Sequence, residues 1–177
     1  HPAMGMIPPD EFIPIAEKTG LITTLGYWVL ETACRQIRNW QDAGHEHLTV
    51  AVNLSALQFR QGDLLERIHD TLECTDICAH QLELEITEST IMDDIDAASS
   101  TMRELHCSGV HISIDDFGTG YSSLSHLKRF PINTVKIDRS FIRDITTDSD
   151  DAAIVSAIIA MAHNMGLRVI AEGVETR

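Results

Sequence analysis

The chain has 177 residues, of which 44% are hydrophobic and 23% charged, a composition typical of one soluble globular domain with a single core. Because it contains neither an apolar run of about 20 residues nor a charged-then-apolar leader, we expect no membrane span or signal peptide within it. Its 13 Lys+Arg against 27 Asp+Glu give a net charge of −14 without a local basic run, which argues against polymeric nucleic acid as a partner.

The predicted elements begin with helices and continue as alternating strands and helices. Between residues 10 and 44 the apolar side chains have helical spacing, with interruptions predicted at Gly20 and Gly26 and an end at Gly44. Strands are predicted at 48–53, 82–86, 110–115, 134–138 and 168–171, and helices at 63–72, 94–106, 124–129 and 151–165. This alternation predicts right-handed βαβ crossovers and a mainly parallel sheet.

Every predicted strand carries a polar side chain near its carboxyl end. These side chains are Asn53, Glu85, Asp115 with Asp116, Lys136 with Asp138, and Glu172. In a TIM-type barrel such ends converge on one mouth, whereas an open doubly wound sheet binds its ligands at a single switch point. The pattern therefore favours an α/β fold of the TIM-type barrel class. Such barrels usually take about 250 residues, so we expect residues 1–177 to form a single domain that lacks material at both ends.

The cysteines do not follow a metal-binding or disulfide pattern. Cys34 and Cys107 stand alone, and the C-x3-C spacing of Cys74 and Cys78 has no second pair, even with His80 nearby. We expect free thiols and a cytoplasmic location.

Asp115 and Asp116 are the most informative pair in the sequence. Consecutive strand side chains diverge unless the strand ends and turns, in which case one carboxylate can bridge two metal ions while the other binds one. With Glu85, Glu172 and the amide of Asn53 they form an all-oxygen set, which favours Mg²⁺ or Mn²⁺ over zinc. Two such ions about 3.5–4 Å apart clamp a phosphoryl group and activate water for in-line attack.

Lys136 and the glycine-rich segment 116–123 each allow two interpretations. Lys136 is predicted to face the same side as Asp138, either as a structural partner of a carboxylate or as a cation that stabilises phosphate charge or orients the attacking water. The segment 116–123 does not match the dinucleotide-binding fingerprint. It is either a turn with Ser122 or Ser123 as a helix cap, or a mobile loop over the metal site.

Six motifs resemble those of a known family in order and spacing. They are PDEFIPIAE (9–17), VNLS (52–55), LEITES (84–89), DDFGTGYSS (115–123), VKID (135–138) and AEGVET (171–176). Together they closely resemble the EAL domain of cyclic di-GMP phosphodiesterases. The resemblance implies a modified TIM barrel that hydrolyses cyclic di-GMP to linear pGpG with two Mg²⁺ or Mn²⁺ ions.

The resemblance also implies a role for each matching residue. The implied metal ligands are Asn53, Glu85, Asp115, Asp116 and Glu172. Lys136 is implied to hold the catalytic water, and Glu172 is also a candidate general base. The implied support for the loop comes from Glu88, Gly118, Thr119 and Gly120, and the possible accessory residues are Asp138 and Glu175. The Glu-Ala-Leu tripeptide of the family is expected before His1, and a glutamine after Arg177.

Three functions from different classes are compatible with these motifs. The first is the enzyme, and the second is a non-catalytic cyclic di-GMP receptor, which usually shows an eroded aspartate pair or loop. Both features are intact here, which favours catalysis. The third is a regulatory or dimerisation module that uses helix 151–165, although its apolar residues are better explained by packing on the barrel. We also expect a homodimer and a neighbouring sensor or GGDEF-type domain in a parent protein that could be attached to a membrane.

Overall fold

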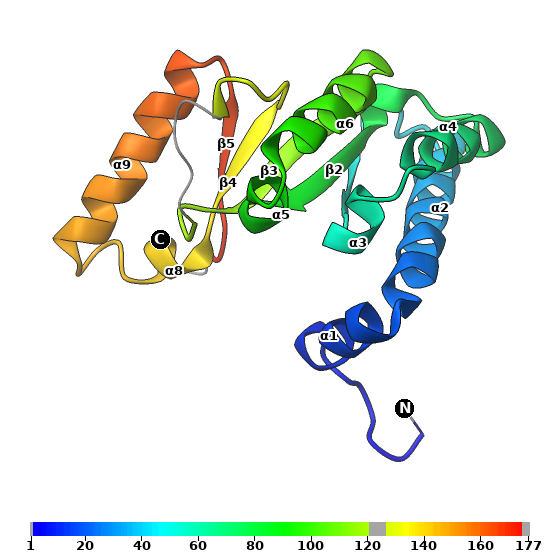
Figure 1. Cartoon of the computed structure of the whole chain (residues 1–177), viewed down its shortest axis with the longest axis horizontal. Coiled ribbons are helices and arrows are strands. Elements are labelled where there is room, and N and C mark those ends of the chain that lie inside the picture. The colour runs from blue at the N-terminus through cyan, green and yellow to red at the C-terminus, as the bar shows by residue number, and fades with distance from the viewer. Residues whose placement is uncertain (1, 121–126, 175–177) are drawn as a thin grey trace.

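The computed structural model describes residues 2–120 and 127–174, which build a five-stranded sheet in the order β1-β2-β3-β4-β5. The strands are β1 (Val50–Asn53), β2 (Leu82–Thr87), β3 (His111–Phe117), β4 (Thr134–Ile137) and β5 (Arg168–Ala171). All four neighbouring pairs are parallel. Because the order follows the chain without reversal across these strands, the sheet is built like the wall of a barrel and not like a doubly wound sheet (Figure 1). The predicted α/β class and parallel sheet are confirmed.

Helices connect the strands and flank the sheet (Figure 1). They are α1 (Pro9–Thr19), α2 (Leu21–Asp42), α3 (Ala56–Phe59), α4 (Leu64–Thr75), α5 (Glu88–Met92), α6 (Ile95–Cys107), α8 (Arg139–Arg143) and α9 (Ser149–Asn164), with a 3-10 turn at Ala79–Gln81. The short helices α3, α5 and α8 were not predicted, because four or five residues carry no periodic signal. Residues 124–126 of the helix predicted at 124–129 lie outside the described residues. Among the helices in the described ranges, none has the length and hydropathy to cross a bilayer.

Gly20 and Gly26 differ in what they do to the chain. Gly20 separates α1 from α2 with a φ of 75°, a left-handed conformation that favours glycine. The interruption predicted at Gly26 is wrong, because Gly26 lies inside α2. A Cβ added there would lie 2.1 Å from Oε1 of the buried Gln58, so glycine is present to admit a neighbouring side chain and not to end the helix.

The two faces of the sheet have opposite chemistry. One face is apolar and belongs to the hydrophobic core with α2, α6 and α9; its buried strand residues include Val52, Leu84, Ile86, Ile112, Ile114, Val135 and Ile137. The alternate residues form the second face, called here the inner face, which includes Ala51 and Ile170 but is mostly polar; its polar members include Asn53, Glu83, Glu85, Ser113, Asp115, Thr134, Lys136 and Arg168. Period-two alternation along each strand therefore separates the core from a polar surface.

The cysteine side chains are free thiols, as predicted. Cys34 is a buried residue of α2, and burial raises the pKa of its thiol to about 11. Its thiol is therefore protonated and inert at neutral pH.

Candidate active site

The two adjacent aspartates lie in a β-bulge of β3. The β3–β4 ladder shifts register between residues 114 and 117, so Asp115 and Asp116 together lie opposite Lys136. Asp116 has a φ of 54°, a left-handed conformation that aspartate adopts more readily than most residues. Its backbone N–H donates a hydrogen bond of 3.0 Å to Oδ1 of Asp115. The strand end predicted at residue 115 is wrong, because β3 continues to residue 117 and the bulge brings the two carboxylates together.

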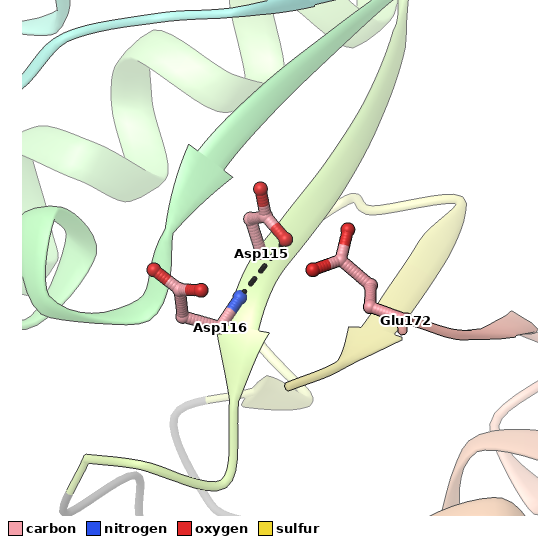
Figure 2. Close-up of side chains that lie close together, drawn as sticks. All are labelled: Asp115, Asp116 and Glu172. Atoms are coloured by element: carbon pink, nitrogen blue, oxygen red, sulfur yellow. Dashed lines mark hydrogen bonds between the residues drawn. The ribbon is translucent and has the colours of Figure 1, made fainter. Parts of the chain in front are cut away.

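Three carboxylates form a compact group at the carboxyl ends of the strands. Asp115, Asp116 and Glu172 each offer an oxygen, and these oxygens lie within 4.8 Å of one another. Figure 2 shows Asp115 and Glu172 facing each other across the space between β3 and the end of β5. Mg²⁺ and Mn²⁺ prefer oxygen ligands, and Mg²⁺ binds them at about 2.1 Å, so oxygens this close need only a small shift to share an ion. The donor set fits a hard divalent cation.

Lys136 lies beside this group and bridges carboxylates from three places in the fold. Its Nζ lies 2.9 Å from Oε2 of Glu85, 3.1 Å from Oδ1 of Asp115 and 2.7 Å from Oε1 of Glu172. Burial by itself would lower the pKa of Lys136, but the hydrogen bonds to Glu172, Glu85 and Asp115 outweigh it and raise the pKa. The ammonium therefore stays charged and compensates part of the negative charge of the site.

Asp116 and Asp138 show opposite pKa shifts. Burial is the largest cause that raises the pKa of Asp116, followed by the charges of Asp115, Asp138 and Glu172. Burial also acts to raise the pKa of Asp138, but hydrogen bonds from Ser140 at the start of α8 outweigh it and lower the pKa. Burial and the neighbouring negative charges thus disfavour the ionised form of Asp116, and a bound cation would compensate those charges.

Glu85 and Asn53 are the other predicted ligands. Glu85 joins the group through Lys136, and Asn53 is an exposed residue that lies opposite Glu85 in the β1–β2 ladder. Within the part of the chain that the structure describes, the metal-compatible group of three carboxylates does not include Glu85. Three residues named from the sequence lie outside the described residues: Ser122, Ser123 and Glu175.

Glu88 holds the start of the loop that follows β3. Its side chain is 1% exposed, and its Oε2 accepts a hydrogen bond of 2.9 Å from the N–H of Gly118. Gly120 lies so close that an added Cβ would be 2.6 Å from Oε1 of Glu88. The hydroxyl of Thr119 donates to the carbonyl of Asp116 at 2.8 Å. The residues predicted to support the loop are thus brought together, and they connect it directly to the bulge.

One ion pair of the inner face was missed by the sequence analysis. Nη2 of Arg168 lies 3.0 Å from Oε2 of Glu83, which is two residues before Glu85 on the same face of β2. The alternation of β2 already placed Glu83 on this face. Local spacing in the sequence does not predict that Arg168 on β5 is its partner.

Comparison with known proteins gives one consistent family. The model of the EAL domain matches residues 1–177. A bifunctional diguanylate cyclase/cyclic di-GMP phosphodiesterase, MucR of Pseudomonas aeruginosa, is 53% identical over 176 residues, which cover 99% of this chain and 26% of that protein. The cyclic di-GMP phosphodiesterase NbdA of the same species is 48% identical over 176 residues, covering 99% and 22%.

A solved structure agrees with the sequence comparisons. The structure described as the PaMucR phosphodiesterase in complex with c-di-GMP superimposes with a TM-score of 0.97 at 53% identity, and covers 100% of this chain and 72% of that chain. This chain thus spans about a quarter of the length of the curated relatives that it matches.

Proposed function

The chain belongs to the EAL domain family, and from this membership we propose that it hydrolyses cyclic di-GMP to linear pGpG with two Mg²⁺ or Mn²⁺ ions. The observation that carries the proposal is the group of Asp115, Asp116 and Glu172 beside Lys136 at the carboxyl ends of the strands. The names of the relatives MucR and NbdA support the substrate, and the relative solved with c-di-GMP supports its binding.

The proposed metal ligands are the five residues implied by the family motifs. Asp115, Asp116 and Glu172 would hold the ions, and Glu85 and Asn53 would extend the oxygen set along β2 and β1. Bound divalent cations would neutralise phosphate charge and make water acidic enough to act as a nucleophile. Because Asp115 lies beside Asp116 in the bulge and 3.1 Å from Nζ of Lys136, we assign it a central place in this ligand set.

Lys136 and Glu172 are the proposed catalytic pair. Their charged atoms are 2.7 Å apart, so one water can contact both. Glu172 accepts a proton from this water while the water oxygen bonds to phosphorus and the bond from phosphorus to one ribose oxygen breaks. The departing ribose oxygen takes up a proton from solvent water, and the product is a linear dinucleotide with a terminal phosphate. Lys136 orients the water and stabilises the charge that develops on the phosphoryl oxygens.

The remaining site residues are assigned supporting roles. Glu88 fixes Gly118, Thr119 and Gly120 next to the bulge, and Asp138 positions Asp116 from the start of α8. Glu175 stays a possible accessory residue. These residues act through the ligands and do not contact the reacting atoms.

The test follows the conversion of cyclic di-GMP to pGpG by chromatography. We expect turnover with Mg²⁺ or Mn²⁺, none with chelator, and little with Ca²⁺, whose larger radius and looser geometry disturb a two-ion site. Asp115→Asn is expected to lose metal binding and turnover together. Full turnover in chelator or with Zn²⁺ alone contradicts the proposal, and tight binding without turnover in Mg²⁺ indicates a receptor instead.

Four further properties stay predictions about the complete protein. We propose that residues 1–177 belong to a single domain, that the protein is a homodimer, and that it works in the cytoplasm. Because the chain covers 26% of the bifunctional relative, we also propose a neighbouring sensor or GGDEF-type domain.

A further inference from the structure

We infer that the ion pair of Arg168 with Glu83 positions the metal ligands by fixing the distance between β2 and β5. This inference rests on the proposed function, because it assigns a role toward the same metal site. Among the described residues, Glu83 and Arg168 form their ion pair with each other and not with the proposed ligands, so they act through the strands that carry the ligands.

The first support is the burial of Glu83. Its side chain is 12% exposed, although it is a carboxylate on a polar face that already carries Glu85 and Asp115. A buried carboxylate near other carboxylates is costly unless a cation compensates it. Nη2 of Arg168, at 3.0 Å from Oε2 of Glu83, is that cation.

The second support is the distance that the pair spans. Glu83 lies on β2 and Arg168 on β5, with β3 and β4 between them in the sheet. Three strand spacings amount to roughly 14 Å along the sheet. The two side chains meet across that distance because the sheet curves toward the inner face, so the ion pair holds a particular curvature.

The third support is what else these two strands carry. Glu85 follows Glu83 by two residues on the same face, and Glu172 follows directly after β5. Both glutamates contact Lys136, at 2.9 and 2.7 Å. The distance between β2 and β5 therefore decides whether Glu85 and Glu172 can both approach Nζ of Lys136. The Glu83–Arg168 ion pair fixes that distance at Glu83, two residues before Glu85 on β2.

Charge and geometry predict different results when the pair is broken. Arg168→Gln makes the inner face more negative by one charge, whereas Glu83→Gln makes it less negative by one. If only charge matters, Arg168→Gln binds a divalent cation more tightly and Glu83→Gln more weakly. If the pair positions the ligands, both variants bind more weakly, and so does the double variant, whose net charge equals that of the wild type.

The experiment is a calorimetric titration of the protein with Mn²⁺, with no substrate present. We expect each single variant and the double variant to raise the Kd for Mn²⁺ by about threefold to tenfold. The matched control is Arg129→Gln, which makes the same charge change and breaks the exposed ion pair of Arg129 with Asp96. It is expected to change the Kd by less than about twofold.

Each outcome bears on the inference. A Kd for Arg168→Gln that is unchanged or lower overturns it, and so does a double variant that binds like the wild type. Because the side chain of Arg168 is 60% exposed, Arg168→Gln is expected to fold. Its Kd for Mn²⁺ therefore tests the inference even if Glu83→Gln fails to fold. A wild-type protein that binds no Mn²⁺ overturns the proposed function and this inference with it, whereas normal wild-type binding with opposite shifts in the single variants overturns the inference alone.

Discussion

The two faces of the sheet are built from alternate residues of the same strands, yet they depend on different physical forces. On the apolar face, Ile112 and Val135 are fully buried and pack in the core. On the inner face, Lys136 holds three carboxylates at distances between 2.7 and 3.1 Å. Burial of apolar area is non-directional, whereas charged contacts depend on the distance and direction between the charged atoms.

This difference indicates which property each face controls. A change on the apolar face removes buried volume and lowers the free energy of unfolding. A change on the inner face alters the charge and geometry of the site while the core stays packed. Variants of the two faces should therefore separate stability from chemistry.

Replacing Lys136 should give the largest effect on chemistry. Lys136→Met removes the charge but keeps much of the side-chain volume, and we expect a rate loss of roughly 10²- to 10³-fold, as for other groups that stabilise developing charge. Cyclic di-GMP and metal binding should remain, as measured by calorimetry beside single-turnover rates. Lost ligand binding with an intact rate per bound complex would instead identify Lys136 as a substrate clamp.

Replacing Ile112 should give the largest effect on stability alone. Ile112 is 0% exposed, and Ile112→Ala is expected to lower the free energy of unfolding by about 2–5 kcal/mol, through lost burial and the cavity that remains. Urea unfolding measures this change, and Ile112→Val should give a smaller one. The Mn²⁺ concentration for half-maximal turnover should match the wild type; a large shift would show that the two faces are not independent.

Loosening the loop should have an intermediate effect on turnover. Glu88→Ala removes the acceptor of the Gly118 N–H, and we expect a loss of about tenfold that higher metal concentration partly restores. Glu88→Gln is the control, because its amide oxygen can still accept that hydrogen bond. An unchanged rate and metal dependence in Glu88→Ala would assign Glu88 no part in the site.

Neutralising Asp116 should give the smallest effect, and one that depends on pH. The folded state raises the pKa of Asp116 above its ordinary value of 3.8, so the ionised carboxylate destabilises the metal-free fold at neutral pH. Below the ordinary pKa the side chain is protonated in both folded and unfolded states, and that cost disappears. Asp116→Asn in chelator should therefore raise the Tm by about 1–3 °C at pH 7 and by less near pH 3. A Tm gain that is equal at both pH values would contradict this electrostatic cause.

Local patterns in the sequence predict the class of the fold and the face of the sheet on which each strand residue lies. Alternation within the strands depends on local chemistry, so the predicted parallel sheet, the polar strand ends and the pair of aspartates agree with the structure. The interruption predicted at Gly26 is wrong. Glycine is needed there because the side chain of Gln58 packs against it, and Gln58 is distant in the sequence.

The contacts between side chains of the inner face follow from the tertiary structure. The bulge that brings Asp115 and Asp116 together is a register shift between β3 and β4, and neither strand reveals it alone. The contacts of Lys136 likewise depend on side chains from different strands, and the ion pair of Arg168 with Glu83 depends on the curvature of the sheet. Local spacing fixes which face a side chain occupies, but distances across strands follow from register and curvature, which only the packed sheet sets.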